Sequence, residues 1–435
     1  MSVEISLVLV VFLFMTSLFL GIPVAFVLGG LAVIFTLLFW GPPGLSVMAY
    51  SAFDVVTTPV LFAVPLFIFM GNLMRYSGLG EELYDAVETW MGGINGGLAI
   101  GTVVICTLFA AMTGIAGAAT ITMALIALPS MAAHGYDKSI YIGTVAAAGL
   151  LGLLIPPSCE MILYAAITSV SLGKMYLAGI GPGLLMASLF VIYIGLRCRF
   201  QPHLAPARKV KVSWGRKLTA GRHVVIPGLL IALILGGIYS GIFTPTEASG
   251  VGAGGVLIIA LARRKLTREA FETSLYSTLR ISGMVFWIII AATCFSHTLT
   301  VTGIGPLLTS IVAGWEVSKW FIILGMLLIL VIMGMFVSDT AIVLIMSPIC
   351  FSITGVLGIH QLWWGLIFVI TMIIGWLTPP YGFNLFYMKA VVPEGITMRD
   401  IYSSVIPFVA CMALCLVICM IFPQIILFIP GLLTR

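Results

Sequence analysis

Two proline pairs interrupt long apolar runs of this chain, and they are the features from which chemistry can first be argued. The segments Gly152-Leu-Leu-Ile-Pro-Pro-Ser158 and Gly375-Trp-Leu-Thr-Pro-Pro-Tyr381 begin 223 residues apart. A double proline removes two backbone N–H donors and breaks a helix. In lipid, such a break is tolerated only where protein or a water-filled cavity satisfies the freed carbonyl groups. Two breaks at matching places in two halves of a chain predict the central site of a transporter.

A carboxylate in the middle of another apolar run is the second indication of a site. Asp339 stands between Ser338 and Thr340, inside a segment that is otherwise apolar from Trp320 to Thr354. Within a membrane, a carboxylate is costly unless it is paired, protonated or bound to a cation. The oxygen-rich surroundings suit a hard cation such as Na⁺. The alternative is that Asp339 caps a short helix at a turn, and the two roles are compatible.

Polar residues also flank both proline pairs. Glu160 follows the first pair closely, at a place where the second pair is followed by Phe383. Glu160 is either a proton or cation site, a group that binds a substrate amine, or the partner of a structural cation. Ser158, Thr378 and Asn384 place further oxygens beside the breaks, where they either coordinate an ion or close their own helices. The amide ends of broken helices favour an anionic group of a substrate.

The composition places this chain in a membrane. Of its 435 residues, 61% are hydrophobic and 8% are charged, whereas about 25% are charged in soluble domains. Several apolar runs reach the roughly 20 residues that a helix needs to cross a bilayer. The first run, from Ile5, follows only Met-Ser-Val-Glu, so we expect a retained span rather than a signal peptide.

The basic residues are clustered beside apolar runs and do not indicate nucleic acid binding. Eight of the 20 Lys and Arg lie between Arg197 and Arg222, and four lie between Arg263 and Arg268. Such clusters predict cytoplasmic loops or contacts with lipid headgroups. The chain has neither a His-Glu-x-x-His motif nor a phosphate-binding Gly-x-x-x-x-Gly-Lys-Ser/Thr loop, so we expect no enzyme activity. Its cysteines show no disulfide or metal-binding pattern.

An internal duplication organises the whole chain. Pro23 pairs with Pro245 and Tyr164 with Tyr387, at almost the same offset as the two proline pairs. A constant offset over this length predicts two repeats. Counting an interrupted run as a re-entrant hairpin gives five crossings in the first half. An odd number predicts that the repeats are inverted, with both termini outside the cell.

The expected fold class is therefore an all-α polytopic membrane protein made of two inverted repeats, each with about five spans, a re-entrant hairpin and a broken helix. We expect the first repeat over residues 1–197, a basic cytoplasmic linker over 198–223, and the second repeat over 224–435. Expected spans of the first repeat are 5–20, 25–40, 58–74 and 175–196, with an interfacial helix 81–91, a hairpin 98–131 and a broken span 139–169. Those of the second are 224–242, 247–261, 281–299 and 401–422, with an interfacial helix 266–279, a hairpin 320–354 and a broken span 362–388. At the start of the span 247–261, Thr246 fits the helix N-cap pattern.

A series of motifs carries a resemblance to a known family. They are Ala63-Val-Pro-Leu-Phe-Ile-Phe-Met-Gly71, Gly96-Gly-Leu-Ala99, His134-Gly-Tyr-Asp-Lys138, Ile155-Pro-Pro-Ser158, Tyr176-Leu-Ala-Gly-Ile-Gly-Pro-Gly183, Phe243-Thr-Pro-Thr-Glu-Ala248 and Thr378-Pro-Pro-Tyr-Gly382. In order and spacing they resemble the large membrane subunit, of the DctM type, of tripartite ATP-independent periplasmic (TRAP) transporters.

The resemblance implies a secondary transporter of the bacterial inner membrane with the elevator fold of the ion-transporter superfamily. It implies that a Na⁺ gradient drives uptake of a small organic acid, with no other cofactor. It also implies two protein partners, a small four-helix membrane subunit and a periplasmic substrate-binding protein.

Carried over by motif, the resemblance places sodium and substrate sites at the hairpin tips and the breaks, with Na⁺ near Gly114, Ser158, Asp339 and Thr378. The first set is Thr113, Gly114, Gly117, Pro156, Pro157, Ser158 and Glu160. The second set is Ser338, Asp339, Thr340, Thr378, Pro379, Pro380, Gly382 and Asn384. Two features depart from the family: the first tip has few serines, and Glu160 replaces a residue that is usually apolar.

Two other functions fit the same residues. The first is a self-sufficient carboxylate symporter or antiporter, coupled to Na⁺ or to protons, which needs no binding protein. The second is an intramembrane enzyme that uses Glu160 or Asp339. The enzyme is disfavoured because the sequence has no paired nucleophile and base.

Overall fold

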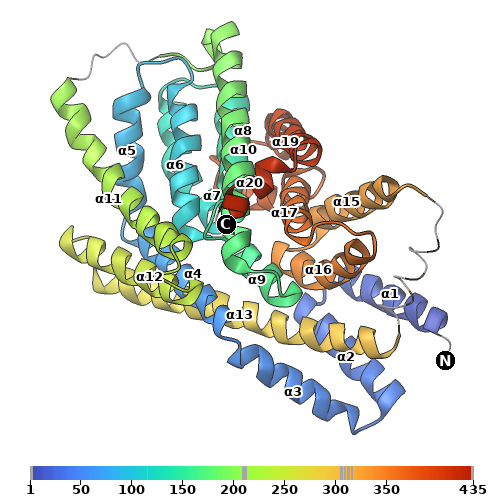
Figure 1. Ribbon diagram of the computed structural model, residues 1–435. Helices are drawn as coiled ribbons and strands as arrows, with labels where there is room; N and C mark the ends of the chain where they lie inside the picture. Colours follow the sequence, from blue (N-terminus) through green and yellow to red (C-terminus); the bar gives the residue numbers. More distant parts are fainter. Residues whose placement is uncertain are drawn as a thin grey trace.

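Helices make up all the regular secondary structure that the computed structural model describes, which covers residues 3–114, 116–207, 213–303, 307, 310, 314 and 317–432. Eight helices of this described part are long and apolar enough to cross a membrane. Figure 1 shows a lower layer that contains α2 (Val24–Trp40), α3 (Gly44–Thr57), α4 (Ala63–Tyr76), α12 (Pro245–Ala262) and α13 (Arg268–Val301), with most of the other helices in a bundle above it. The predicted all-α polytopic class is confirmed.

The first half begins with the helices of that layer and continues with a hairpin and a broken helix. Its elements are α1 (Val3–Phe19), α2 (Val24–Trp40), α3 (Gly44–Thr57), α4 (Ala63–Tyr76), α5 (Leu79–Met91), α6 (Gly97–Thr113), α7 (Ala116–Ala133), α8 (Lys138–Gly149), α9 (Cys159–Thr168) and α10 (Leu172–Phe200). Short 3₁₀ turns, η1 (Pro59–Phe62), η2 (Leu150–Leu153) and η3 (Pro202–Leu204), precede α4, extend α8 and follow α10.

The second half repeats this order. Its elements are α11 (Trp214–Tyr239), α12 (Pro245–Ala262), α13 (Arg268–Val301), α15 (Lys319–Phe336), α16 (Asp339–Val356), α17 (Gln361–Leu377), α18 (Phe383–Val391), α19 (Met398–Ile421) and α20 (Gln424–Leu432). Both predicted broken spans are confirmed, because α8 and α9, and likewise α17 and α18, are separate helices on either side of a proline pair.

Contacts between the halves come in matching pairs. In the lower layer, α4 packs on α12 while α2 packs on α13. In the upper bundle, α9 packs on α16 while α7 packs on α18. In both pairs, the second contact joins the counterparts of the two helices that form the first contact. This is expected for two repeats of one plan. The division at residues 197 and 224 stays a prediction, and α11 begins at Trp214, inside the expected linker.

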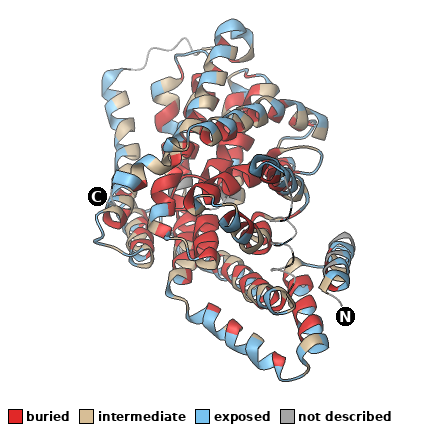
Figure 2. Ribbon diagram, turned by 45° about the vertical axis from the view of Figure 1, so that its right-hand side comes forward, coloured by how far each residue is buried: buried red, intermediate tan, exposed pale blue. Residues whose placement is uncertain are grey.

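The central core lies around α17. Every residue of this helix from Leu362 to Leu377 is buried, and so is every residue of α8 from Ile140 to Gly149. Helices that are apolar on all sides must be covered on all sides. Figure 2 shows this buried centre and, around it, helices with exposed residues on their outer faces. Many of those exposed residues are large and apolar, such as Phe53, Leu229 and Phe428, which fits an exterior in contact with lipid.

The structure corrects three of the expected elements. The interfacial helix 266–279 and the span 281–299 are one helix, α13, because no proline interrupts the backbone hydrogen bonds between them. Helix α3 was not predicted, since only one narrow side of it is buried, at Gly44, Ser51 and Val55. Helix α20 was not predicted either, because it has only nine residues, fewer than the roughly 20 that a helix needs to cross a bilayer.

The start of α12 corrects a fourth expectation. The N-cap is Thr244, whose hydroxyl accepts a hydrogen bond from the Glu247 N–H at 3.3 Å, while the Glu247 carboxylate accepts one from the Thr244 N–H at 2.7 Å. Pro245, which has no N–H, occupies the first helical position, so the cap falls on the residue before it. Thr246 instead donates to the Pro59 carbonyl at 3.0 Å and ties α12 to η1.

Candidate functional site

The first hairpin tip lies directly on the first break. Gly114 has a φ of +62°, and its carbonyl accepts a hydrogen bond from the Cys159 N–H at 3.2 Å. A Cβ at Gly114 would lie 2.8 Å from the Pro157 carbonyl oxygen, too close for any other residue. The tip is therefore built for a close approach of two backbones. The Thr113 side chain lies outside the described part of the chain.

Backbone carbonyls also converge at the second break. A Cβ at Gly382 would lie 2.8 Å from the Trp376 oxygen and 3.0 Å from the Thr378 oxygen. Gly382 has a φ of +26° and precedes the first residue of α18. The Pro380 carbonyl accepts a hydrogen bond from the Tyr402 hydroxyl. A glycine therefore lies against backbone carbonyl oxygen at both breaks, with one carbonyl, that of Pro157, at Gly114 and two carbonyls at Gly382.

The hydroxyl groups beside the breaks close their own helices. Ser158 caps α9 by accepting from the Met161 N–H at 3.4 Å, and it donates to the Leu153 carbonyl at 2.8 Å. Thr378 donates to the Ile374 carbonyl at 2.6 Å. An ion at either break is therefore expected to meet mainly backbone oxygens, with the hydroxyl oxygens offering only their remaining lone pairs.

Asn384 joins the two halves. Its amide nitrogen donates to the Ala146 carbonyl of α8 at 2.7 Å, and its side chain is fully buried. The amide oxygen, Oδ1, has no hydrogen-bond partner in the described structure. Asn384 thus fixes the start of α18 against α8 and leaves one acceptor free.

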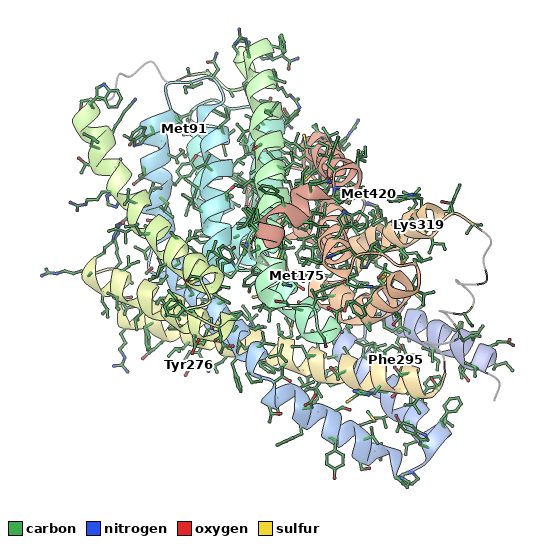
Figure 3. All side chains as sticks on the ribbon, in the orientation of Figure 1. Met91, Met175, Tyr276, Phe295, Lys319 and Met420 are labelled. Carbon is green, nitrogen blue, oxygen red and sulfur yellow. The ribbon has the colours of Figure 1, made fainter. Side chains whose placement is uncertain are left out.

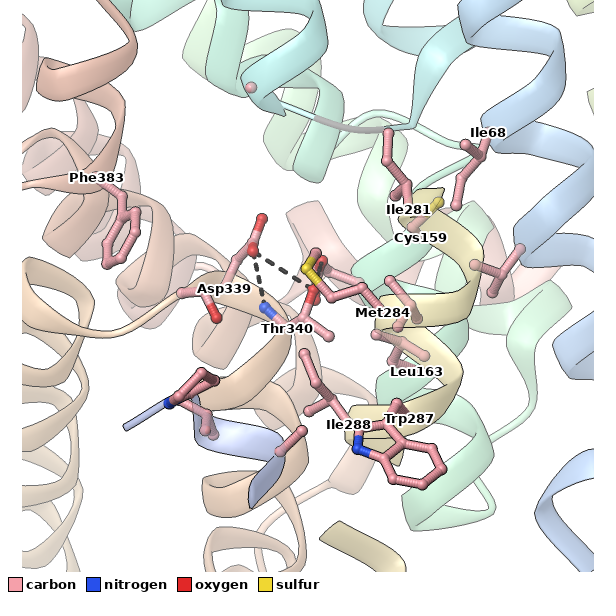
Figure 4. Close-up of a pocket in the computed structure, with 18 of the residues that line it drawn as sticks. Ile68, Cys159, Leu163, Ile281, Met284, Trp287, Ile288, Asp339, Thr340 and Phe383 are labelled. Carbon is pink, nitrogen blue, oxygen red and sulfur yellow. Dashed lines mark hydrogen bonds between the residues drawn. The ribbon is translucent and has the colours of Figure 1, made fainter. Parts of the chain in front are cut away.

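A threonine connects two buried carboxylates from different halves. The Thr340 hydroxyl donates to Glu160 Oε1 at 3.1 Å and lies 3.5 Å from Asp339 Oδ1, which also accepts from the Thr340 N–H at 2.8 Å. Glu160 is 4% exposed and Asp339 is 8% exposed. Glu160 Oε2 has no partner in the described structure. Figure 4 shows Asp339 and Thr340 with the hydrogen bonds between them.

These carboxylates line a cavity of about 680 Å³ between the lower layer and the hairpin tips. The layer contributes residues of α2, α4 and α13; the bundle contributes residues of α7, α9, α16, α17 and α18. Of the residues predicted for the site, those that line the cavity are Gly117, Glu160, Ser338, Asp339 and Thr340. Those predicted residues that do not line it are Gly114, Pro156, Pro157, Ser158, Thr378, Pro379, Pro380, Gly382 and Asn384.

The cavity also contains polar residues that the sequence did not single out. Asn72 and Arg75 lie one turn apart on α4 and both line it. From the sequence, Arg75 is expected only at the cytoplasmic end of a span. The signal that could have identified it is its spacing from Asn72, since two polar residues three positions apart share one face of an apolar helix.

An aromatic group closes the other side of the cavity. Trp376 stacks on Phe383, with ring centroids 5.8 Å apart, and lies 6.2 Å from the Tyr387 ring. The Trp376 indole donates to the Val337 carbonyl at 3.3 Å, which attaches the second hairpin tip to the second break. Figure 3 shows how densely side chains fill the bundle around these elements.

Comparisons with known proteins identify a family that matches most of the chain. The family model described as "Tripartite ATP-independent periplasmic transporter, DctM component" matches residues 10–425. The C4-dicarboxylate TRAP transporter large permease protein DctM of Pseudomonas aeruginosa is 37% identical over 407 residues, which are 92% of this chain and 93% of that protein. The ectoine TRAP transporter large permease protein TeaC of Halomonas elongata is 28% identical over 423 residues, which are 96% and 97% of the two chains.

A solved structure has a similar fold. The crystal structure of the YdaH transporter of Alcanivorax borkumensis superposes with a TM-score of 0.67 at 14% identity, covering 94% of this chain and 99% of that one. At this identity the likeness concerns the fold alone.

Proposed function

Because the chain belongs to the DctM component family of tripartite ATP-independent periplasmic transporters, we propose that it imports a small organic acid by coupling to a sodium gradient. It is a large permease subunit, a multi-pass protein of the bacterial inner membrane. Its expected partners are a small membrane subunit with four helices and a periplasmic protein that delivers the substrate.

The observation that carries the sodium proposal is the geometry of the two breaks. At each break, backbone carbonyl oxygen lies against a glycine. One carbonyl, that of Pro157, lies at Gly114, and two, those of Trp376 and Thr378, lie at Gly382. Unwound carbonyls beside the ends of broken helices are the groups that hold Na⁺ in transporters of this kind of architecture. Ser158 and Thr378 add oxygens to the first and second break, and Asp339 adds a carboxylate at the second hairpin tip.

The proposed substrate class follows from the relatives. Their names give C4-dicarboxylates, ectoine, isethionate and sialic acid as cargo, and all of these carry an acidic group. A cavity of about 680 Å³ accommodates molecules of this size. Arg75 in its lining is a group suited to bind a carboxylate or sulfonate.

The proposed mechanism is a movement of the bundle against the lower layer. The cavity lies between these two parts, with α2, α4 and α13 on one side and the hairpin tips and broken helices on the other. Sliding of the second group past the first would carry the bound acid and Na⁺ from one side of the membrane to the other. In this elevator mechanism, ion binding at the breaks orders the tips before the movement.

Thermal unfolding of the purified chain in NaCl, with KCl and choline chloride as controls, tests the coupling ion. Binding of Na⁺ to the native state alone stabilises it by about 2.7 kcal/mol at a hundredfold excess over Kd. We expect Na⁺ to raise the melting temperature, and we expect Asp339→Asn to lose most of this effect. Glu394→Gln, a change at an exposed carboxylate, serves as the control and should keep it. Equal melting temperatures in all three salts would contradict sodium coupling.

Reconstituted uptake tests the need for a binding protein. The complex of the chain with its small subunit should transport only when the binding protein is added. Uptake by the chain alone would favour the self-sufficient symporter or antiporter.

A further inference from the structure

We propose that Glu160, together with Asp339 and Thr340, binds a positively charged group of the substrate, so that the imported molecule is a zwitterion rather than a dicarboxylate. This inference rests on the proposed function, because it names the substrate class of the same cavity. It concerns a buried carboxylate that the geometry of the breaks does not use.

The first step is the unfilled hydrogen-bonding capacity of Glu160. Its Oε2 atom is buried, has no partner in the described structure, and belongs to a side chain that lines the cavity. No Lys, Arg or His is paired with it among the described residues. A buried carboxylate without a counter-charge is strongly destabilising. Its partner is therefore expected to be a group that enters the cavity.

The second step is the shared hydroxyl. Thr340 has one O–H donor, yet it lies within 3.5 Å of a carboxylate oxygen of both Glu160 and Asp339. The hydroxyl proton bonds to one acceptor at a time, and Asp339 Oδ1 also accepts from the Thr340 N–H at 2.8 Å, so the hydroxyl serves Glu160 Oε1 while Glu160 Oε2 keeps no donor in the described structure. An ammonium group has three donors, which match Glu160 Oε2, an oxygen of Asp339 and the Thr340 oxygen. A single Na⁺ at the hairpin tip would neutralise Asp339 and leave Glu160 without a partner.

The third step is the opposite charge in the same cavity. Arg75, on α4, lines it; its guanidinium lies over the ring of Tyr76, at 5.1 Å, and forms no ion pair with a described residue. It is therefore available to a carboxylate of the substrate, which it matches in geometry. The lining thus has a cationic group contributed by the lower layer and an anionic group contributed by the bundle. A molecule with one acidic and one ammonium group is complementary to both.

Two pairs of small molecules test this proposal on the full-length purified chain in saturating NaCl. The pairs are β-alanine with succinate and 4-aminobutyrate with glutarate. In each pair, a carboxylate of the second compound replaces the ammonium group of the first. We expect thermal stabilisation by the amino acid of each pair at a concentration at least tenfold lower than by the dicarboxylate.

Three variants test the contributions of the acidic and the basic group of the cavity separately. Glu160→Gln keeps the size of the side chain and should remove the preference for the amino acids. Arg75→Gln should weaken the thermal stabilisation by both compounds of each pair to a similar extent. Glu394→Gln should change neither result. A sodium-dependent rise in the melting temperature of Glu160→Gln verifies that this variant is folded and still binds the coupling ion.

The proposal is overturned if either dicarboxylate stabilises the chain as well as its amino acid, if neither amino acid stabilises it, or if Glu160→Gln keeps the preference. Failure of the proposed function has a different signature, namely no sodium-specific stabilisation of the unmodified chain. Sodium stabilisation with a preference for succinate would leave the transporter proposal standing and reject the zwitterion.

Discussion

Thr340 is the residue through which the two carboxylates of the cavity interact. The sequence identified Glu160 and Asp339 separately, because each is an acid within an apolar run. It did not predict that they share a hydroxyl, since they are 179 residues apart and no local pattern pairs them. For Ser158 and Thr378 it allowed either coordination of an ion or capping of their own helices. In the structure, both hydroxyls donate to backbone carbonyls at the ends of neighbouring helical segments. The sequence therefore predicted single residues of the site but could not predict the contacts between its distant segments.

Replacing Thr340 tests how much the shared hydroxyl contributes to the stability of the fold. Thr340→Val keeps the shape but removes the donor to Glu160 Oε1. Leaving a buried acceptor without its donor costs about 1–3 kcal/mol, so the melting temperature should fall. Thr340→Ser, which retains the hydroxyl, is the matched control. Equal stability of the valine and serine variants would show that the hydrogen bond contributes nothing.

Gly114 tests the close contact of the first tip with the first break. In Gly114→Ala, the new Cβ meets the Pro157 oxygen at 2.8 Å on a backbone with φ of +62°. We expect a loss of about 1–3 kcal/mol in the free energy of unfolding, together with weaker sodium stabilisation. Gly250→Ala is the control, because a Cβ there meets open space on helix α12 and should be neutral or stabilising. Similar behaviour of the two variants in thermal unfolding would refute the tight fit.

At the scale of elements, proline and glycine signals predicted well, whereas amphipathic signals predicted the helix α5 but gave a wrong boundary within α13. Both hairpins and both broken helices were predicted, because each depends on local breaks in long apolar runs. Helix α3 was missed because it lies at the edge of the molecule with a mostly exposed surface. The continuity of α13 was not predicted, because a charged residue such as Arg280 is typical of the end of an interfacial helix. In the structure the helix continues through Arg280.

Removing the first break tests an element as a whole. Pro156-Pro157→Ala-Ala supplies two N–H donors and lets helix α8 continue toward α9. The carbonyl directed at Gly114 would then be used within the helix. We expect transport in proteoliposomes to fall at least tenfold while membrane insertion is retained.

The chain offers a matched control for this change in a third proline pair, outside the two breaks. Pro42-Pro43→Ala-Ala lies ahead of α3 and does not touch the cavity lining, so it should preserve transport. An equal loss of transport in both variants would mean a general folding defect rather than a role for the first break.

At the scale of the whole molecule, an ion cluster connects helices of the two halves. Glu82 on α5 accepts from Arg263, which follows α12, and pairs with His223 on α11 at 3.0 Å and with Lys265 at 3.8 Å. Burial raises the pKa of Glu82, but the hydrogen bonds from His223 and Arg263 outweigh it, so the pKa lies below its ordinary value. The cluster attaches α5 to α11 and to the end of α12, which belongs to the lower layer.

Because the pKa of Glu82 is lowered, the stability of the fold should depend on pH. A lowered folded-state pKa means that Glu82 stabilises the fold above its ordinary pKa of 4.5, and the contribution is lost as the pH falls through the folded value. Glu82→Gln should reduce stability at pH 7 by about 1–2 kcal/mol and flatten the fall in melting temperature below about pH 5. Glu272→Gln, in the exposed pair with Arg268, should have almost no effect. An equally steep fall in Glu82→Gln would refute this assignment.

The contacts of α9 with α16 and of α7 with α18 have a consequence for synthesis of the chain. A ribosome delivers Glu160 to the membrane long before Thr340 exists, and the acceptor carbonyl of Ala146 long before its donor Asn384. A nascent chain that stops between the halves therefore holds a carboxylate in the bilayer with nothing to solvate it. Such truncated products should be recognised by membrane proteases, and only the completed polypeptide should escape degradation. Pulse-labelled chains ending after Phe200, the last residue of α10, should accordingly be shorter-lived than full-length ones, and Glu160→Gln should lengthen the lifetime of the fragment.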